Sequence, residues 1–436
     1  MKKYMIIGIL LMLLLCGCAK EEEINPDAVN FAECPTIAIE DVDTLPCLNA
    51  PVTGTDDAPR ICTAAEDGMF FLKLNDGSHD KQFLHFYDFT TGETYPVCAK
   101  PNCTHDDYLC SAYLTDASFL HYDSSYLYYF SGNGCQFWRM NTDGTDRKVL
   151  FTCNEKAESG ALMSILGAAY LDGKVYFAYR GSAMNPETLE ITSGESICVG
   201  DLSSGKFTIL PVKFQEDKNS STLNVLGMYD HQLVIRHSNT LSTGFNGYQK
   251  NEETICLLDV NTLETTVLYQ WQWDTNDDGM GVGYQPDSID EGYMIFCIYT
   301  DKYQHPTYAD GEIEAVWPGD RLFVDLSQKK AYRMTNQDSL NSAEEIIADG
   351  KWIHLRWDEN HTFVEKVVQD LATGEVFLLP ESIRDIPFDS SIRSVGKYYV
   401  VGKVGAERWM SGYLPKEDYW AGKQDFVEFP EWVILT

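Results

Sequence analysis

Three cysteines and one histidine lie close together early in the chain. Cys98, Cys103, His105 and Cys110 follow the spacing Cys-x4-Cys-x-His-x4-Cys. Thiolate sulfur and imidazole nitrogen are the ligands that tetrahedral Zn²⁺ prefers, so the segment is a candidate metal site. A disulfide or a reduced, buried cluster would also account for these residues. The disulfide is the favoured interpretation for an exported chain, with at least two of the cysteines within bonding reach and His105 pointing away from them.

A second candidate metal site is acidic. Asp274, Asn276 and Asp278 alternate in the segment Asp-Thr-Asn-Asp-Asp-Gly, which matches the opening of a calcium-binding loop. The twelfth position of that loop holds Gln285, where an EF-hand has a bidentate glutamate, and no helical pattern flanks it. An acidic turn is therefore the favoured interpretation and a Ca²⁺ site the alternative. Zn²⁺ and Ca²⁺ are the two cofactors that the sequence suggests.

The N-terminus predicts export. A basic start at Lys2 and Lys3 precedes an apolar run from Met5 to Leu15, which is too short to span a membrane as a helix. Leu-Cys-Gly-Cys, ending at Cys18, resembles the lipobox of bacterial lipoproteins. The resemblance implies that residues 1–17 are a signal peptide and that Cys18 carries a lipid. Residues 18–34 are acidic and predict a tether, so we expect a lipid-anchored protein of the bacterial cell envelope, on the outer face of the cytoplasmic membrane.

Charge and missing motifs limit the function. The 436 residues contain 66 Asp and Glu against 33 Lys and Arg, a net charge of −33. Nucleic acid is therefore excluded as a partner, because its phosphates would be repelled. The metalloprotease motif His-Glu-x-x-His, the hydrolase motif Gly-x-Ser-x-Gly and the Walker loop are all absent from the sequence. These absences favour a non-catalytic protein.

Two short patterns alternate along the rest of the chain and must position these residues. One is a strand-like run that ends in an aspartate and a turn, at Asp88, Asp201, Asp259, Asp325 and Asp370, with variants at Asn141 and Asp418. The other is a tight turn that leads into an aromatic or β-branched strand, as at Asp172-Gly173, and it recurs at intervals of roughly 50–60 residues. Each unit therefore holds two hairpins, which is four strands.

Repeated four-stranded units predict an all-β fold, a seven-bladed β-propeller with four antiparallel strands per blade. Six or eight blades are the alternatives for the number, and a β-sandwich is the alternative for the fold. No long linker divides the chain, so residues 35–436 are expected to form a single propeller domain. Thr36-Ile-Ala-Ile near its start is expected to add the outer strand of the last blade and close the ring.

Two resemblances extend this interpretation. The Asp-Gly-led strands and the turn Asn141-Thr-Asp-Gly-Thr-Asp resemble TolB-type propellers. The cysteine segment, with the lipobox, resembles uncharacterised exported lipoproteins of Gram-positive anaerobes, across nearly the whole chain. The resemblance implies the propeller and transfers no active residue. We expect a surface-anchored, non-catalytic lipoprotein that binds a glycan, a peptide or an envelope protein. The alternative is a hydrolase or lyase that acts on extracellular glycan or peptide.

Overall fold

The computed structural model consists almost entirely of β-strands. The single helix within the described ranges is α3 (Lys416–Trp420). It is not long and apolar enough to cross a membrane. The structure describes residues 36–38, 62–75, 78–131, 136–153, 162–184, 191–212, 221–243, 249–274, 283–290, 292–299, 320–335, 343–348, 350–357, 363–373, 375–378, 388–403, 412–421, 423 and 426–429.

The described strands form seven sheets, each built around four consecutive strands that pair antiparallel. The first sheet contains β2 (Cys62–Ala65), β3 (Gly68–Asn75), β4 (Ser78–Asp88), β5 (Glu93–Pro96) and β6 (Tyr113–Leu114). The second contains β7 (Ser118–Tyr122), β8 (Tyr126–Ser131), β9 (Gln136–Asn141) and β10 (Lys148–Thr152). The third contains β11 (Leu162–Leu171), β12 (Lys174–Met184), β13 (Ile191–Asp201) and β14 (Lys206–Ile209).

The remaining four sheets repeat this order. They contain β15 (Ser221–Tyr229), β16 (Gln232–Thr243), β17 (Gln249–Asp259) and β18 (Thr265–Asp274); β19 (Gly283–Asp290), β20 (Tyr293–Tyr299), β21 (Asp320–Asp325) and β22 (Lys330–Thr335), joined by β1 (Thr36–Ala38); β23 (Ala343–Ala348), β24 (Lys351–Trp357), β25 (Phe363–Asp370) and β26 (Val376–Leu378); and β27 (Phe388–Val395), β28 (Tyr398–Lys403), β29 (Gly412–Pro415) and β30 (Val427–Glu428).

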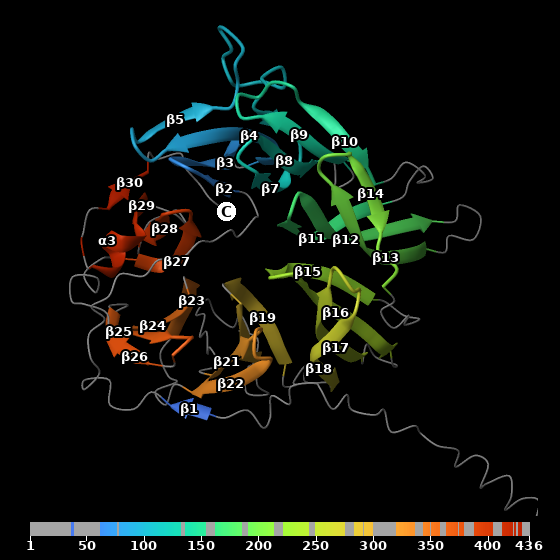
Figure 1. Ribbon diagram of the computed structural model, residues 1–436, viewed down its shortest axis with the longest axis vertical. Coiled ribbons are helices and arrows are strands. Elements are labelled where there is room, and N and C mark those ends of the chain that lie inside the picture. Colours follow the sequence, from blue (N-terminus) through green and yellow to red (C-terminus); the bar gives the residue numbers. More distant parts are fainter. Residues whose placement is uncertain are drawn as a thin grey trace, which may run out of the picture.

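The sheets stand around a common axis, as Figure 1 shows. The first strand of each sheet lies nearest the axis, and the fourth lies at the outer rim. This radial arrangement is a β-propeller. The predicted all-β propeller of four-stranded antiparallel units is therefore confirmed.

The recurring aspartates occupy equivalent positions, as the repeat predicts. Each ends the third strand of its sheet: Asp88 in β4, Asp201 in β13, Asp259 in β17, Asp325 in β21 and Asp370 in β25. In each, Oδ1 accepts hydrogen bonds of 2.7–3.2 Å from the backbone N–H groups two and three residues further on. A short carboxylate can do this locally, so it starts the turn to the fourth strand.

The fourth residue after the aspartate turns the chain back. It is Gly92 in the first sheet and Gly205 in the third, with φ of 70° and 65°. Leu263 and Lys329 occupy the same place with φ of 61° and 52°, a left-handed conformation that strains residues other than glycine. The turn geometry therefore holds even where the sequence departs from glycine.

The hydrophobic core is distributed between neighbouring sheets. Phe70 and Leu84 of the first sheet pack in one cluster with Leu127 and Tyr129 of the second, and similar clusters join the second sheet to the third and the third to the fourth. Cys198 and Cys256 are buried in two of these clusters, 0% and 3% exposed, and burial raises the pKa of each thiol to about 12. Both cysteines are small hydrophobic core residues, as their position in the repeat predicts.

Among the described residues, side-chain contacts hold the first sheet against the last. Aromatic residues of both sheets share one cluster, and no described strand of one sheet pairs with the other. The hydroxyl of Tyr413 donates to the carbonyl oxygen of Phe89 at 3.0 Å, and Lys397 Nζ lies 3.3 Å from Asp67 Oδ1. The ring is therefore closed by packing and a few polar contacts.

Two local expectations were wrong. Segment β1 does not complete the last sheet, because it pairs in parallel with β22 at the rim of the fifth sheet, with Thr36 opposite Arg333. Asp418 does not start a hairpin turn, because it lies in α3, which directly follows the end of β29 at Pro415. The outer edge of β22 accepts β1, and the chain after Pro415 forms a helical turn in place of a hairpin.

Candidate metal centre

The cysteine segment is a loop whose two ends are fixed to one strand. It leaves β5 after Pro96 and returns at β6, and both of these strands pair with β4. The backbone of Leu84 holds the base, since its carbonyl accepts from the N–H of Val97 at 2.9 Å and its N–H donates to the carbonyl of Ala112 at 2.8 Å. Figure 1 shows this loop projecting outward from the rim beyond β5.

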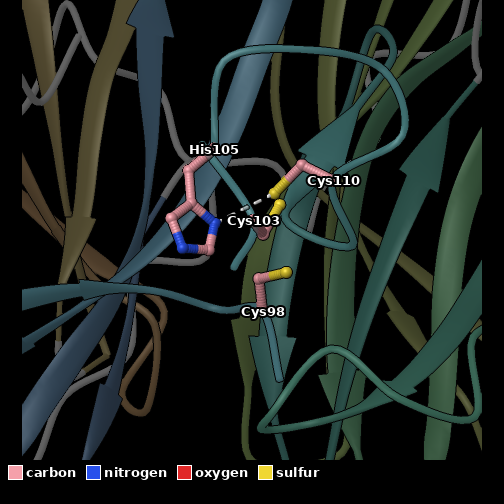
Figure 2. Close-up of side chains that lie close together, drawn as sticks. All are labelled: Cys98, Cys103, His105 and Cys110. Carbon is pink, nitrogen blue, oxygen red and sulfur yellow. Dashed lines mark hydrogen bonds between the residues drawn. The ribbon is translucent and has the colours of Figure 1, made fainter. Parts of the chain in front are cut away.

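The four predicted ligands converge inside the loop. The ligand atoms of Cys98, Cys103, His105 and Cys110 all lie within 4.8 Å of one another. Figure 2 shows the three sulfur atoms and the imidazole ring directed toward a common centre, with His105 Nδ1 3.4 Å from Cys110 Sγ. Within the described ranges, this is the one group of three or more metal-ligating side chains.

The expectation that His105 points away from the cysteines was therefore wrong. His105 has a φ of 57°, a left-handed conformation that is uncommon outside glycine, and its imidazole faces the sulfur atoms. All three thiols are free in this structure.

The three thiols differ in their electrostatic environment. Burial raises the pKa of Cys98, but N–H groups of Lys100 and Ser111 and the Ser111 hydroxyl bond to its sulfur and lower the pKa to about 6. Burial raises the pKa of Cys110 to about 12, assisted by its contacts with Cys98 and Cys103 and opposed by the N–H of Ala112. The surroundings therefore favour the thiolate form at Cys98 more than at Cys110, and a cation that binds these sulfur atoms must displace their protons.

The donor set fits a structural zinc ion. Three thiolates and one imidazole make up a tetrahedral Cys₃His site, with Zn–S near 2.3 Å and Zn–N near 2.0 Å, which places ligand atoms about 3.3–3.8 Å apart. The observed cluster needs only a small contraction to reach those separations. N–H groups bonded to Cys98 sulfur provide outer contacts of the kind that orient metal ligands.

The second sheet supports the base of the loop. The turn between β9 and β10 carries Gly144, where an added Cβ would lie 2.3 Å from the carbonyl oxygen of Val97 and 3.0 Å from Cβ of Ser111. Arg147 of the same turn donates through Nη1 to the carbonyl of Tyr113 at 2.7 Å. The sequence suggested that the cysteine motif lies between the first two units, but only the fold shows these contacts.

The other predicted site residues remain untested. Asp274 is the last residue of β18, whereas Asn276 and Asp278 lie outside the described residues, so the calcium site stays a prediction. Cys18, the predicted lipidation site, also lies outside them.

Comparisons with known proteins describe only the general architecture. No family model matches the chain, and no curated protein matches it at a significant level. Similar solved structures include the β-propeller domain of the Trilobed protease from Pyrococcus furiosus, at 9% identity and a TM-score of 0.44, covering 87% of this chain and 98% of that one. Another is the Pyrococcus horikoshii acylaminoacyl peptidase, at 12% identity and a TM-score of 0.47, covering 87% of this chain and 53% of that one. Such similarities assign no activity, substrate or site residue to this chain.

Proposed function

We propose that this chain is a zinc-binding β-propeller lipoprotein whose metal has a structural role. The observation that carries the proposal is the convergence of three thiols and one imidazole within 4.8 Å. Four protein ligands complete a tetrahedral shell, so the ion has no open position for water or substrate, as in structural zinc sites. The chemistry of the ligands thus favours stabilisation of the fold over catalysis.

Zinc would replace the core that this loop lacks. The only fully buried hydrophobic residues of the cluster around it are Phe83, Cys110 and Ala112, which is little apolar surface for a loop that leaves the sheet. A metal ion with four ligands supplies folding free energy directly to a segment of this kind. It would fix the connection where the first sheet passes to the second.

Metal analysis tests the proposal. We expect one zinc per chain in protein purified with reductant, and loss of the zinc from Cys110→Ser. Cys153→Ser is the matched control, since Cys153 is a half-buried cysteine outside the cluster. Cobalt substitution should produce thiolate-to-cobalt absorption in the wild type and in the control. Protein that binds neither metal while its three thiols remain reduced would contradict the zinc site, and so would a disulfide within the cluster in freshly prepared protein.

We also propose that Cys18 carries a lipid and holds the propeller on the outer face of the cytoplasmic membrane. The lipobox-like Leu-Cys-Gly-Cys segment and the acidic residues that follow support this. Cys18→Ser is expected to release the protein from the membrane fraction. A variant that remains membrane-bound to the same extent would refute lipidation as the anchor.

We further propose that each of the seven sheets is one blade and that the ring is a non-catalytic platform for a glycan, a peptide or an envelope protein. The seven separate sheets support this number over six or eight. A rigid ring whose loops differ between blades is suited to binding. The alternative, a hydrolase or lyase of extracellular glycan or peptide, predicts turnover of such substrates by the purified protein, and a screen for released products distinguishes the two.

A further inference from the structure

Two large apolar side chains stand out from the tip of the cysteine loop. Tyr108 is 75% exposed and Leu109 is 59% exposed, the two highest values among the large hydrophobic residues in the described part of the chain. They are consecutive, and the next residue, Cys110, is only 3% exposed. The pair therefore directly precedes a buried cysteine of the candidate metal centre.

The backbone under this pair is ordered by local hydrogen bonds. The N–H of Leu109 donates to Asp107 Oδ1 at 2.8 Å, and the N–H of Cys110 donates to the carbonyl of Asp107 at 3.1 Å. Lys100 Nζ donates to the carbonyl oxygen of Leu109. A backbone held in this way loses little conformational entropy when a partner covers its side chains, which favours binding.

The charge around the pair selects the kind of partner. Asp106 and Asp107 are exposed beside Tyr108, Lys100 at the carbonyl of Leu109 offsets one of these charges, and the whole chain has a net charge of −33. Anionic polymers and anionic lipid surfaces would be repelled, whereas a basic protein surface would be attracted. Tyrosine is also enriched at the centres of protein interfaces, where it fills pockets.

We infer that Tyr108 and Leu109 form a docking knob that enters an apolar pocket, rimmed by Lys or Arg, on a protein partner. The inference deepens the proposed function and rests on it, because zinc bound by Cys98, Cys103, His105 and Cys110 would hold the knob in place. The partner is a basic protein, and not a second copy of this acidic chain. Burial of either side chain supplies enough free energy for at least a tenfold change in Kd.

Site-specific photo-cross-linking on intact cells identifies the partner. A benzoylphenylalanine at position 108 is expected to cross-link one discrete protein, which mass spectrometry identifies. The control places the same group at Tyr95, an exposed tyrosine of β5 in the same sheet. The identified protein, once purified, should bind the zinc-loaded full chain, and its affinity should fall as salt rises. Cross-linking that does not exceed the Tyr95 control would overturn the inference.

Binding assays with that purified protein complete the test. Tyr108→Ser and Leu109→Ser are each expected to weaken binding at least tenfold, with Tyr95→Ser unchanged. Equal affinity in all variants would overturn the docking knob. A second refuting result would be that the wild type co-sediments with phosphatidylcholine vesicles and that either substitution abolishes this, because the knob would then bind lipid.

Zinc content separates this inference from the proposed function. Tyr108→Ser and Leu109→Ser should keep one zinc per chain, because neither residue is a ligand, whereas Cys110→Ser should lose both zinc and partner binding. If the chain carries no zinc but the knob variants still lose the partner, the docking knob stands and the zinc proposal fails. If zinc is present and the knob variants bind the partner normally, the zinc proposal stands and the docking knob fails.

Discussion

Replacement of Gly144 by alanine should destabilise the protein through a contact between the first and second sheets. Gly144 has a φ of 82°, and an added Cβ would lie 2.3 Å from the carbonyl oxygen of Val97, at the base of the cysteine loop. Gly173, in the turn between β11 and β12, provides a matched control. It has a φ of 71°, but an added Cβ would meet nothing within 4 Å.

The two substitutions separate backbone strain from steric overlap. A non-glycine residue in the left-handed region costs about 1–2 kcal/mol, so Gly173→Ala should lose about that much stability. Gly144→Ala carries the same strain, and relief of the contact with a backbone carbonyl adds about 1–3 kcal/mol. The expected total for Gly144→Ala is therefore about 2–5 kcal/mol.

Denaturant titration of both variants beside the wild type measures the difference. Gly144→Ala should unfold at a clearly lower midpoint than Gly173→Ala, and it should also lower zinc affinity, because the turn supports the loop that holds the ligands. Equal midpoints for the two variants would refute the close contact between the Gly144 turn and Val97. A large loss of stability with unchanged zinc affinity would refute the coupling between turn and metal centre.

Three further outcomes are expected. Hydrogen bonds from the Ser203 and Ser204 groups lower the pKa of Asp201 to about 2, so its stabilising contribution is present above pH 4 and lost as pH falls toward 2. As the pH falls from 4 toward 2, the melting temperature of Asp201→Asn should therefore fall less than that of the wild type. Lys329→Gly should raise the free energy of unfolding by about 0.5–1 kcal/mol, measured by denaturant titration, because glycine tolerates the φ of 52°. Arg180 donates to Glu195, whose side chain is 5% exposed and whose pKa burial raises. Arg180→Ala should cost about 3 kcal/mol at pH 7 and less as the pH falls, because the raised pKa of Glu195 lets it take up a proton sooner.

Much of the fold was predictable because its turns are encoded locally. Asp88 and Asp201 each bond to backbone groups within three residues of themselves, so the pattern around them predicts the turn without knowledge of the rest of the chain. The same holds for Asp172 and Gly173, whose φ values of 48° and 71° suit a tight hairpin. Repetition of two such turns implies four-stranded units, and therefore a propeller.

The pairing of short edge segments was less predictable. Thr36–Ala38 can add to the outer edge of several sheets, and backbone hydrogen bonds do not discriminate among them. In the structure it pairs with β22 in parallel. The first strands β7, β11, β15, β19 and β27 also shift register against their second strands, which the sequence pattern does not indicate. In β11 the shift spans Gly167, whose φ of 93° glycine adopts without strain.

The sequence by itself determined which residues can make turns, which can be buried and which can bind a soft metal, because these properties belong to side chains and their near neighbours. Only the tertiary structure decided that His105 faces Cys110 at 3.4 Å, and that both ends of the loop are held at Leu84. The same spacing of cysteines permits a disulfide or a metal site, since separation along the chain does not define direction in space. Direction comes from the folded loop, whose two ends are held by the pairing of β5 and β6 with β4.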